Sequence, residues 1–138
     1  MAVWSILAAP LLMSVDLGTI RPEFKEILLN KDIIAIDQDS LGKQGLRVWN
    51  KSKCEIWNRE LSDGSYALAF VSRREDGAPY TLKVSFDDMK ITKQTYEVQD
   101  LYKEEKYRTF GPEGDFETRI NPSGVKFYKF IPKSSNKI

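Results

Sequence analysis

Residues 4–14 read Trp-Ser-Ile-Leu-Ala-Ala-Pro-Leu-Leu-Met-Ser, an apolar stretch that one proline interrupts. Pro10 lacks a backbone donor and disfavours helix at the residue before it, so a helix is predicted from Trp4 to Ala9. Residues 11–14 are apolar at successive positions, which is typical of a parallel strand covered on both faces. The stretch therefore predicts a helix followed by a buried parallel strand.

The next thirty residues predict two more helices and a joint. Residues 20–29 have an amphipathic pattern with Pro22 at the first helical position, and residues 31–38 contain three isoleucines that favour a further short helix. Two glycines within residues 41–45 indicate a connection between domains. We place the boundary near Lys43, which divides the chain into residues 1–43 and 44–138.

From residue 46 the pattern changes from helical spacing to alternation with a period of two. Short runs rich in β-branched and aromatic residues alternate with turn residues, as in an antiparallel β-sandwich of Greek-key type. The predicted strands are 46–49, 54–57, 66–71, 80–86, 95–101, 107–110, 116–120 and 125–131. The Asp63-Gly64 pair favours a hairpin between the second and third of these. Residues 134–138 are expected to form a frayed tail.

Composition limits the chemistry that the chain can perform. Its 138 residues suffice for one ordinary domain but not for a complete α/β barrel of roughly 250 residues. The net charge of +1 creates no strong positive field that would attract nucleic acid or an anionic membrane. The chain has no histidine, which excludes histidine-based nucleophile pairs and the commonest metal ligand. Cys54 is the only cysteine, and its place in a strand pattern predicts a buried packing residue.

The apolar start could also be interpreted as a secretory signal peptide over residues 1–15. No Lys or Arg precedes the apolar core, whereas a signal peptide expects a positive start. The run is also too short and too interrupted for a membrane-spanning helix. We therefore favour the barrel interpretation and expect no membrane span.

Three stretches together resemble family 27 of the glycoside hydrolases, the α-galactosidases and α-N-acetylgalactosaminidases. Residues 4–14 resemble the last helix-to-strand step of that family's catalytic barrel. Residues 36–45 (Ile-Asp-Gln-Asp-Ser-Leu-Gly-Lys-Gln-Gly) resemble its passage out of the barrel, and residues 120–125 (Ile-Asn-Pro-Ser-Gly-Val) resemble its final hairpin. The resemblance implies a mainly β chain, in which the last helix-strand-helix piece of a (β/α)8 barrel precedes the sandwich.

The resemblance also implies a retaining mechanism with two aspartates about 5 to 5.5 Å apart. In the family the nucleophile follows Lys-Tyr, and the acid/base lies on a later barrel strand, both before the part matched here. We therefore expect no catalytic residue in this chain and no metal or organic cofactor. Asp37 and Asp39 form the most tempting pair, but we interpret them as capping and linker residues. Asp87-Asp88 and Glu104-Glu105 are predicted to be solvated turn charges.

Two other features could bind or carry sugars. Trp49, Trp57 and the tyrosines could form a stacking platform, which would make residues 44–138 a carbohydrate-binding module. Aromatic residues within strand patterns usually fill a sandwich core, so we favour packing. Residues Asn50-Lys51-Ser52 form a glycosylation sequon in a polar turn, which makes Asn50 a candidate N-glycosylation site.

Two functional hypotheses follow. The first is the C-terminal part of a lysosomal or secreted glycosidase, homodimeric when intact, whose missing barrel binds the glycoside substrate. The second is a free-standing β-sandwich that binds carbohydrate or protein without catalysis. Under the first hypothesis, the apolar side chains of residues 3–36 lack the barrel that normally covers them. We then expect residues 44–138 to fold without them, and to be more soluble than the whole chain.

Overall fold

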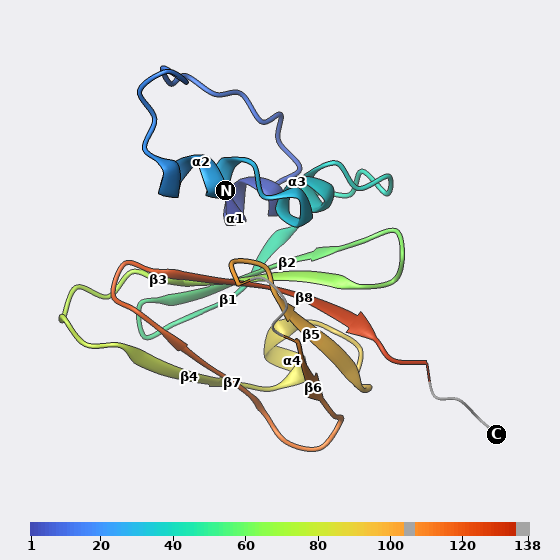
Figure 1. Ribbon diagram of the computed structural model, residues 1–138. Helices are drawn as coiled ribbons and strands as arrows, with labels where there is room; N and C mark the ends of the chain where they lie inside the picture. The colour runs from blue at the N-terminus through green and yellow to red at the C-terminus, as the bar shows by residue number, and fades with distance from the viewer. Residues whose placement is uncertain (104–106, 135–138) are drawn as a thin grey trace.

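The computed structural model describes residues 1–103 and 107–134, and it shows a helical layer against one face of a β-sandwich (Figure 1). The helices are α1 (Ala2–Ile6), α2 (Pro22–Leu28), α3 (Lys31–Asp37) and α4 (Phe86–Met89). The strands are β1 (Leu46–Lys51), β2 (Cys54–Glu60), β3 (Tyr66–Ser72), β4 (Tyr80–Val84), β5 (Tyr96–Asp100), β6 (Tyr107–Phe110), β7 (Phe116–Ile120) and β8 (Val125–Pro132).

The strands form two antiparallel sheets of unequal size. The larger has six strands in the order β1-β2-β3-β8-β5-β6, and the smaller pairs β4 with β7. Strand β8 returns late in the sequence to lie between β3 and β5, which is the long-range return expected of a Greek-key arrangement. The prediction of a mainly β, antiparallel sandwich is confirmed.

The main core lies between the two sheets and consists largely of aromatic side chains. On β7, buried and exposed residues alternate strictly, so Phe116, Thr118 and Ile120 face inward. The ring of Phe116 lies 5.0 Å from that of Phe130 and 5.6 Å from that of Phe70 (centroid distances), mostly at steep angles. Such tilted and edge-to-face contacts add stability beyond the buried area.

The predicted strand 80–86 ends earlier than expected. β4 stops at Val84, and Ser85 begins the short helix α4 through a capping box. The Ser85 Oγ accepts from the amide of Asp88 at 3.1 Å, while Asp88 Oδ2 accepts from the amide of Ser85 at 3.0 Å. The prediction was thus wrong for Phe86, which is helical, and for Asp88, which is a capping residue.

The N-terminal helices agree with the sequence pattern except around Pro10. α1 ends at Ile6, before Pro10, because Ala8 already has a left-handed φ of 52°. Residues 11–14 form no strand, so that prediction was wrong. A parallel strand exists only when neighbouring strands pair with it, and the described residues contribute no strand beside this segment.

Helices α1 and α3 cover the outer face of the six-stranded sheet and make a second core there. Ile6 and Ile33 have no exposed surface, and they belong to one cluster with Ala67 and Ala69 of β3 and Phe127 of β8. The expectation that residues 3–36 lack a covering was therefore wrong for these two helices, and so was the reason for expecting residues 44–138 to fold without them. The second core also explains why β3 is apolar on both faces, because each face of the strand lies against a core.

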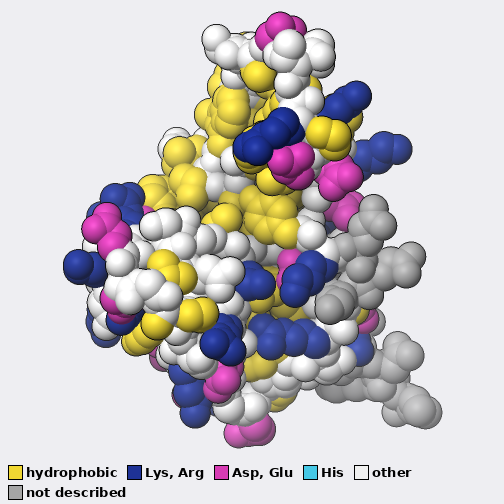
Figure 2. Space-filling view, turned by 60° about the vertical axis from the view of Figure 1, so that its left-hand side comes forward, with side chains coloured by type: hydrophobic (Ala, Val, Ile, Leu, Met, Phe, Trp, Pro, Cys, Tyr) yellow, Lys and Arg dark blue, Asp and Glu magenta, His cyan; other side chains and the backbone are white. Residues whose placement is uncertain are grey.

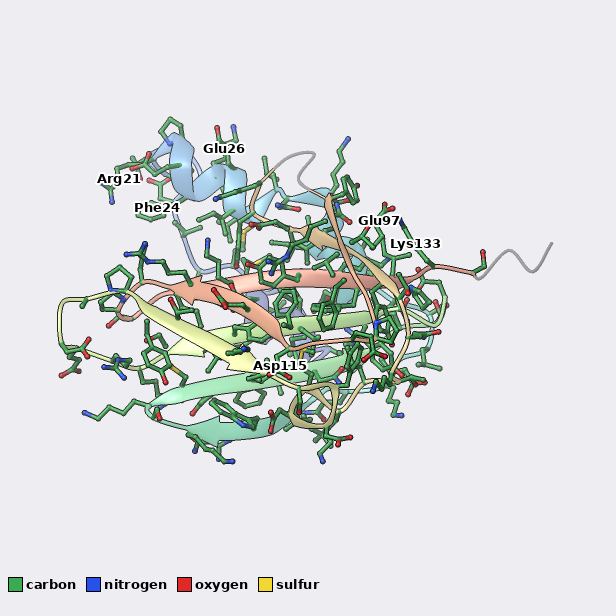
Figure 3. The ribbon with its side chains drawn as sticks, turned by 90° about the horizontal axis from the view of Figure 1, so that it is seen from below. Arg21, Phe24, Glu26, Glu97, Asp115 and Lys133 are labelled. Carbon is green, nitrogen blue, oxygen red and sulfur yellow. The ribbon has the colours of Figure 1, made fainter. Side chains whose placement is uncertain are left out.

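The segment between these helices remains open. We call its exposed apolar residues, together with the adjoining faces of α2, the apolar strip. It comprises Leu12, Met13, Val15, Leu17, Phe24, Ile27 and Leu29. Figure 2 shows apolar side chains gathered over this helical layer, with charged residues more frequent on the sandwich below. Arg21 lies over the Phe24 ring on α2, at the edge of the molecule (Figure 3).

Cys54 is fully buried on the inner face of β2, in the same core as Ile56. Burial raises the pKa of its thiol, so the reactive thiolate is scarce as well as inaccessible. We predict that a thiol reagent labels Cys54 at least about a hundredfold more slowly in the folded chain than in urea. We also expect Cys54→Ser to cost roughly 1 to 3 kcal/mol, because it places a polar hydroxyl in the apolar core where the sulfur packs. Labelling at equal rates in both states would contradict this assignment.

Candidate functional site

Arg59 on β2 ties the N-terminal helices to the sandwich. Its side chain is 1% exposed, and Nη1 donates to the carbonyl oxygens of Ser5 at 2.8 Å and Ile36 at 2.7 Å. Nη1 also lies 3.2 Å from the carbonyl of Asp37, and Nε donates to the carbonyl of Lys43 at 3.0 Å. Because the last carbonyls of a helix have no partner within that helix, one guanidinium satisfies the ends of both α1 and α3.

Gly45 closes the same joint from the other side. Its amide donates to the Ile6 carbonyl at 2.7 Å, and a Cβ at this position would lie 2.5 Å from both the Asn58 carbonyl oxygen and Ile6 Cγ2. Only glycine allows α1 to approach β2 this closely. The glycines that indicated a connection in the sequence thus include one that contact geometry requires.

We predict that Arg59→Met lowers the free energy of unfolding by about 3 to 5 kcal/mol, because it removes the charged donor of hydrogen bonds to carbonyls at both helix ends. The donors that remain there, the amides of Ala8 and Asp39, lie farther from the Ser5 and Ile36 carbonyls, at 3.2 and 3.3 Å. Urea unfolding followed by tryptophan fluorescence measures this change. Arg21→Met serves as the matched control, since the Arg21 side chain is largely exposed and its loss should cost less than about 0.5 kcal/mol. Equal effects of the two substitutions would show that Arg59 does not hold the joint.

Asp37 and Asp39 lie beside Arg59 but have different partners. Asp37 is buried, and its Oδ2 accepts from Gln38 Nε2 at 2.6 Å. Asp39 accepts from the Ser62 amide at 2.9 Å and hydroxyl at 2.8 Å, which links the connecting segment to the β2–β3 turn. Burial raises the pKa of Asp39, but hydrogen bonds from Ser62 and Leu41 outweigh it and leave the pKa below its usual range. Both carboxylates are engaged within the joint, consistent with a linker role.

A small opening of about 440 Å³ adjoins the joint and is lined by Ala8, Pro10, Asp37, Asp39 and Arg59 among others. Within the described residues, Arg59 Nη2 and Asp37 Oδ1 have no hydrogen-bond partner. No aromatic side chain lines the opening, so it offers no stacking surface for a sugar ring.

Trp49 and Trp57 pack on opposite faces of the large sheet. Trp49 packs against the core between the two sheets, whereas Trp57 packs against the core beneath α1 and α3. The indole of Trp57 also donates to Glu55 Oε2 at 3.0 Å. The two rings therefore share no platform, and the packing interpretation holds.

The remaining candidates lie on the surface or outside the described residues. Asn50 is exposed on β1, beside a two-residue turn in which Ser52 and Lys53 have φ values of 53° and 58°. Asp87 is exposed on α4, and the pair Glu104-Glu105 lies outside the residues that the structure describes.

The described ranges contain no group of three or more Cys, Asp or Glu side chains placed to hold a metal ion. Among the same residues, no helix combines the length and the apolar character that crossing a membrane would need.

The sequence alone does not single out Arg59, although a signal is present. Arg59 follows Glu55 and Trp57 at intervals of two, so the three side chains share one face of β2. A large aromatic residue on that face indicates that it is covered, and a covered arginine needs several acceptors. The acceptors themselves are backbone atoms, which sequence patterns do not reveal.

Comparison with known proteins covers almost the whole chain. Residues 42–124 match the sequence profile of the α-galactosidase A C-terminal β-sandwich domain, and residues 1–39 match the profile of α-galactosidase A. The α-N-acetylgalactosaminidase of Gallus gallus is 43% identical over 136 residues, covering 97% of this chain and 33% of that protein. Human α-galactosidase A is 48% identical over 87 residues, which are 62% of this chain and 20% of that protein.

Solved structures agree with this match in fold. The structure of α-galactosidase I from Mortierella vinacea superposes with a TM-score of 0.84 at 22% identity, over 97% of this chain and 34% of that one. The chain thus spans about a third of the length of the curated relatives that match nearly all of it. By its sandwich and by the helices that precede it, the chain belongs to the α-galactosidase and α-N-acetylgalactosaminidase family of glycoside hydrolases.

Proposed function

We propose that this chain is the C-terminal part of a retaining glycosidase that removes terminal α-linked galactose or N-acetylgalactosamine from glycoconjugates. The observation that carries the proposal is the pair of adjoining matches. The helices before the sandwich match the profile of α-galactosidase A, and the sandwich matches the profile of the α-galactosidase A C-terminal β-sandwich domain. In this proposal the two catalytic aspartates belong to the preceding part of the barrel.

The apolar strip supports this assignment. Leu12 is 78% exposed and Leu17 is 64% exposed, and a hollow of about 440 Å³ beside them is lined almost entirely by apolar side chains such as Trp4, Met13 and Phe24. An exposed apolar surface of this kind marks an interface. We expect the preceding barrel to cover it.

The isolated chain should not hydrolyse an α-galactoside or an α-N-acetylgalactosaminide. General acid catalysis and nucleophilic attack require two carboxylates on one rigid face. Here Asp37 and Asp39 are held by Gln38 and Ser62 instead. Incubation of the purified chain with both p-nitrophenyl glycosides is expected to release no nitrophenol above the blank. Turnover that survives Asp37→Asn but is lost on another single Asp or Glu substitution would reveal a catalytic site within the chain.

We further propose that the intact protein is lysosomal or secreted, that it forms a homodimer, and that Asn50 carries an N-linked glycan. The exposure of Asn50 beside the β1–β2 turn makes it accessible to a glycosyltransferase. The protein expressed through a secretory pathway should lose mass on enzymatic deglycosylation, whereas its Asn50→Gln variant should not.

A further inference from the structure

A pocket of about 480 Å³ opens between the two sheets, where the two-stranded sheet leaves part of the larger one uncovered. Strands β5, β6, β7 and β8 all contribute to its lining. We call it the β5–β8 pocket. Its size lies within the range of sites for small molecules. On β8, Lys126 lies on the same inward face as Tyr128 and Phe130. An apolar residue would be expected at this position if the core continued there.

The lining of the β5–β8 pocket concentrates positive charge. Its cations are Lys103, Arg108, Arg119 and Lys126, and its carboxylates are Asp100 and Glu117. Within the described parts of the chain, none of these six residues takes part in a salt bridge. Counted over these described residues, the lining carries a net charge of about +2.

One of the lining groups, Arg108, is held in place by the fold. The Arg108 guanidinium lies 4.1 Å from the centre of the Phe116 ring, and its Nη2 donates to the Glu117 carbonyl at 3.0 Å. Its other N–H groups have no hydrogen-bond partner among the described residues. A fixed guanidinium with free donors is well suited to an oxyanion.

Two buried hydroxyls complete the lining. Thr118 is 5% exposed and Tyr128 is 7% exposed, and their hydroxyl oxygens lie 2.8 Å apart. Only one hydroxyl hydrogen is used between them, so the other can be donated to a ligand. Burial raises the pKa of Tyr128, which keeps its hydroxyl protonated.

We propose that the β5–β8 pocket binds a sugar that carries an anionic substituent. The oxyanion pairs with Arg108 and Lys126, which lie on the inward faces of β6 and β8, and the sugar hydroxyls pair with the Thr118–Tyr128 hydroxyls. A simple anion would use only the cations, and a neutral sugar would use only the hydroxyls. This binding does not depend on the glycosidase activity proposed above.

The test is titration of the 138-residue chain, followed by calorimetry and by amide chemical shifts. The charged probes are galactose 6-sulfate, galactose 6-phosphate and N-acetylneuraminate, which separate sulfate, phosphate and carboxylate as the anionic group. Neutral galactose and inorganic sulfate are the partial probes. At least one charged sugar should bind about tenfold or more tighter than either partial probe, and its affinity should fall as salt rises.

Substitutions locate the site. Lys126→Gln and Arg108→Gln should each lower the affinity for the best probe by about tenfold, and Tyr128→Phe should lower it by about threefold. Lys25→Gln, which removes an exposed cation on α2, should leave binding unchanged. If Arg108→Gln unfolds the chain, Lys126→Gln still decides. The proposal is overturned if no charged sugar binds, if galactose or inorganic sulfate binds as tightly as the best charged sugar, or if Lys25→Gln weakens binding as much as Lys126→Gln.

Discussion

Deletion of residues 1–43 is expected to abolish the cooperative unfolding of the sandwich, or to lower its melting temperature by more than about 15 °C. The deletion uncovers Phe127, Leu61 and Leu101, which are at most 3% exposed in the intact chain. Burial of each large side chain contributes roughly 1.5 to 3 kcal/mol to the free energy of unfolding. The summed loss is therefore comparable with the entire stability of a small domain, about 5 to 15 kcal/mol. The deletion also removes every backbone carbonyl to which the buried Arg59 donates a hydrogen bond.

A second variant distinguishes the contribution of the covering helices to stability from the effect of the apolar strip on self-association. Substitution of residues 12–28 by a Gly/Ser linker of equal length keeps α1, Asn30 and α3, and removes most of the exposed apolar residues. We expect this variant to melt within about 3 °C of the original chain and to self-associate less. Thermal melts and sedimentation of all three proteins make the comparison. A monomeric 44–138 fragment with an unchanged melting temperature would show that α1 and α3 contribute nothing to the sandwich.

The strands of the sandwich could be predicted from the sequence because alternation reports burial directly. Each predicted strand from 46–49 to 125–131 overlaps an observed one, and the Asp63-Gly64 hairpin joins β2 to β3 as expected. Phe86 was misassigned because its place after Val84 continues the alternation, while the Ser85 cap starts a helix. Local hydrogen bonding outweighed the pattern there.

The joint could be predicted only in part. Glycine spacing predicted a connection within residues 41–45, but it did not predict the hydrogen bonds from Arg59 to backbone carbonyls of two helices. Sequence patterns carry no information on such acceptors. Residues 11–14 show the opposite case: the residues favour a buried strand, but a strand also needs partners, and the described chain supplies none.

A chimera should recover the activity that the isolated chain lacks. In the α-N-acetylgalactosaminidase of Gallus gallus, the matching C-terminal third would be replaced by this chain, which is 43% identical to it over 136 residues. The preceding barrel would then cover the apolar strip and contribute the catalytic pair. We expect hydrolysis of p-nitrophenyl α-N-acetylgalactosaminide within about tenfold of the unmodified enzyme. The same chimera with Arg59→Met should be less stable, because its joint is weakened.

The most direct test of the account is therefore the hydrolysis rate of the purified chimera, measured beside the isolated 138-residue chain and the chicken enzyme truncated before the replaced part. We expect turnover by the chimera alone among these three. A folded, monodisperse chimera without activity, or turnover by the isolated 138-residue chain, would contradict the claim that this chain completes the barrel of an α-galactosidase-family enzyme.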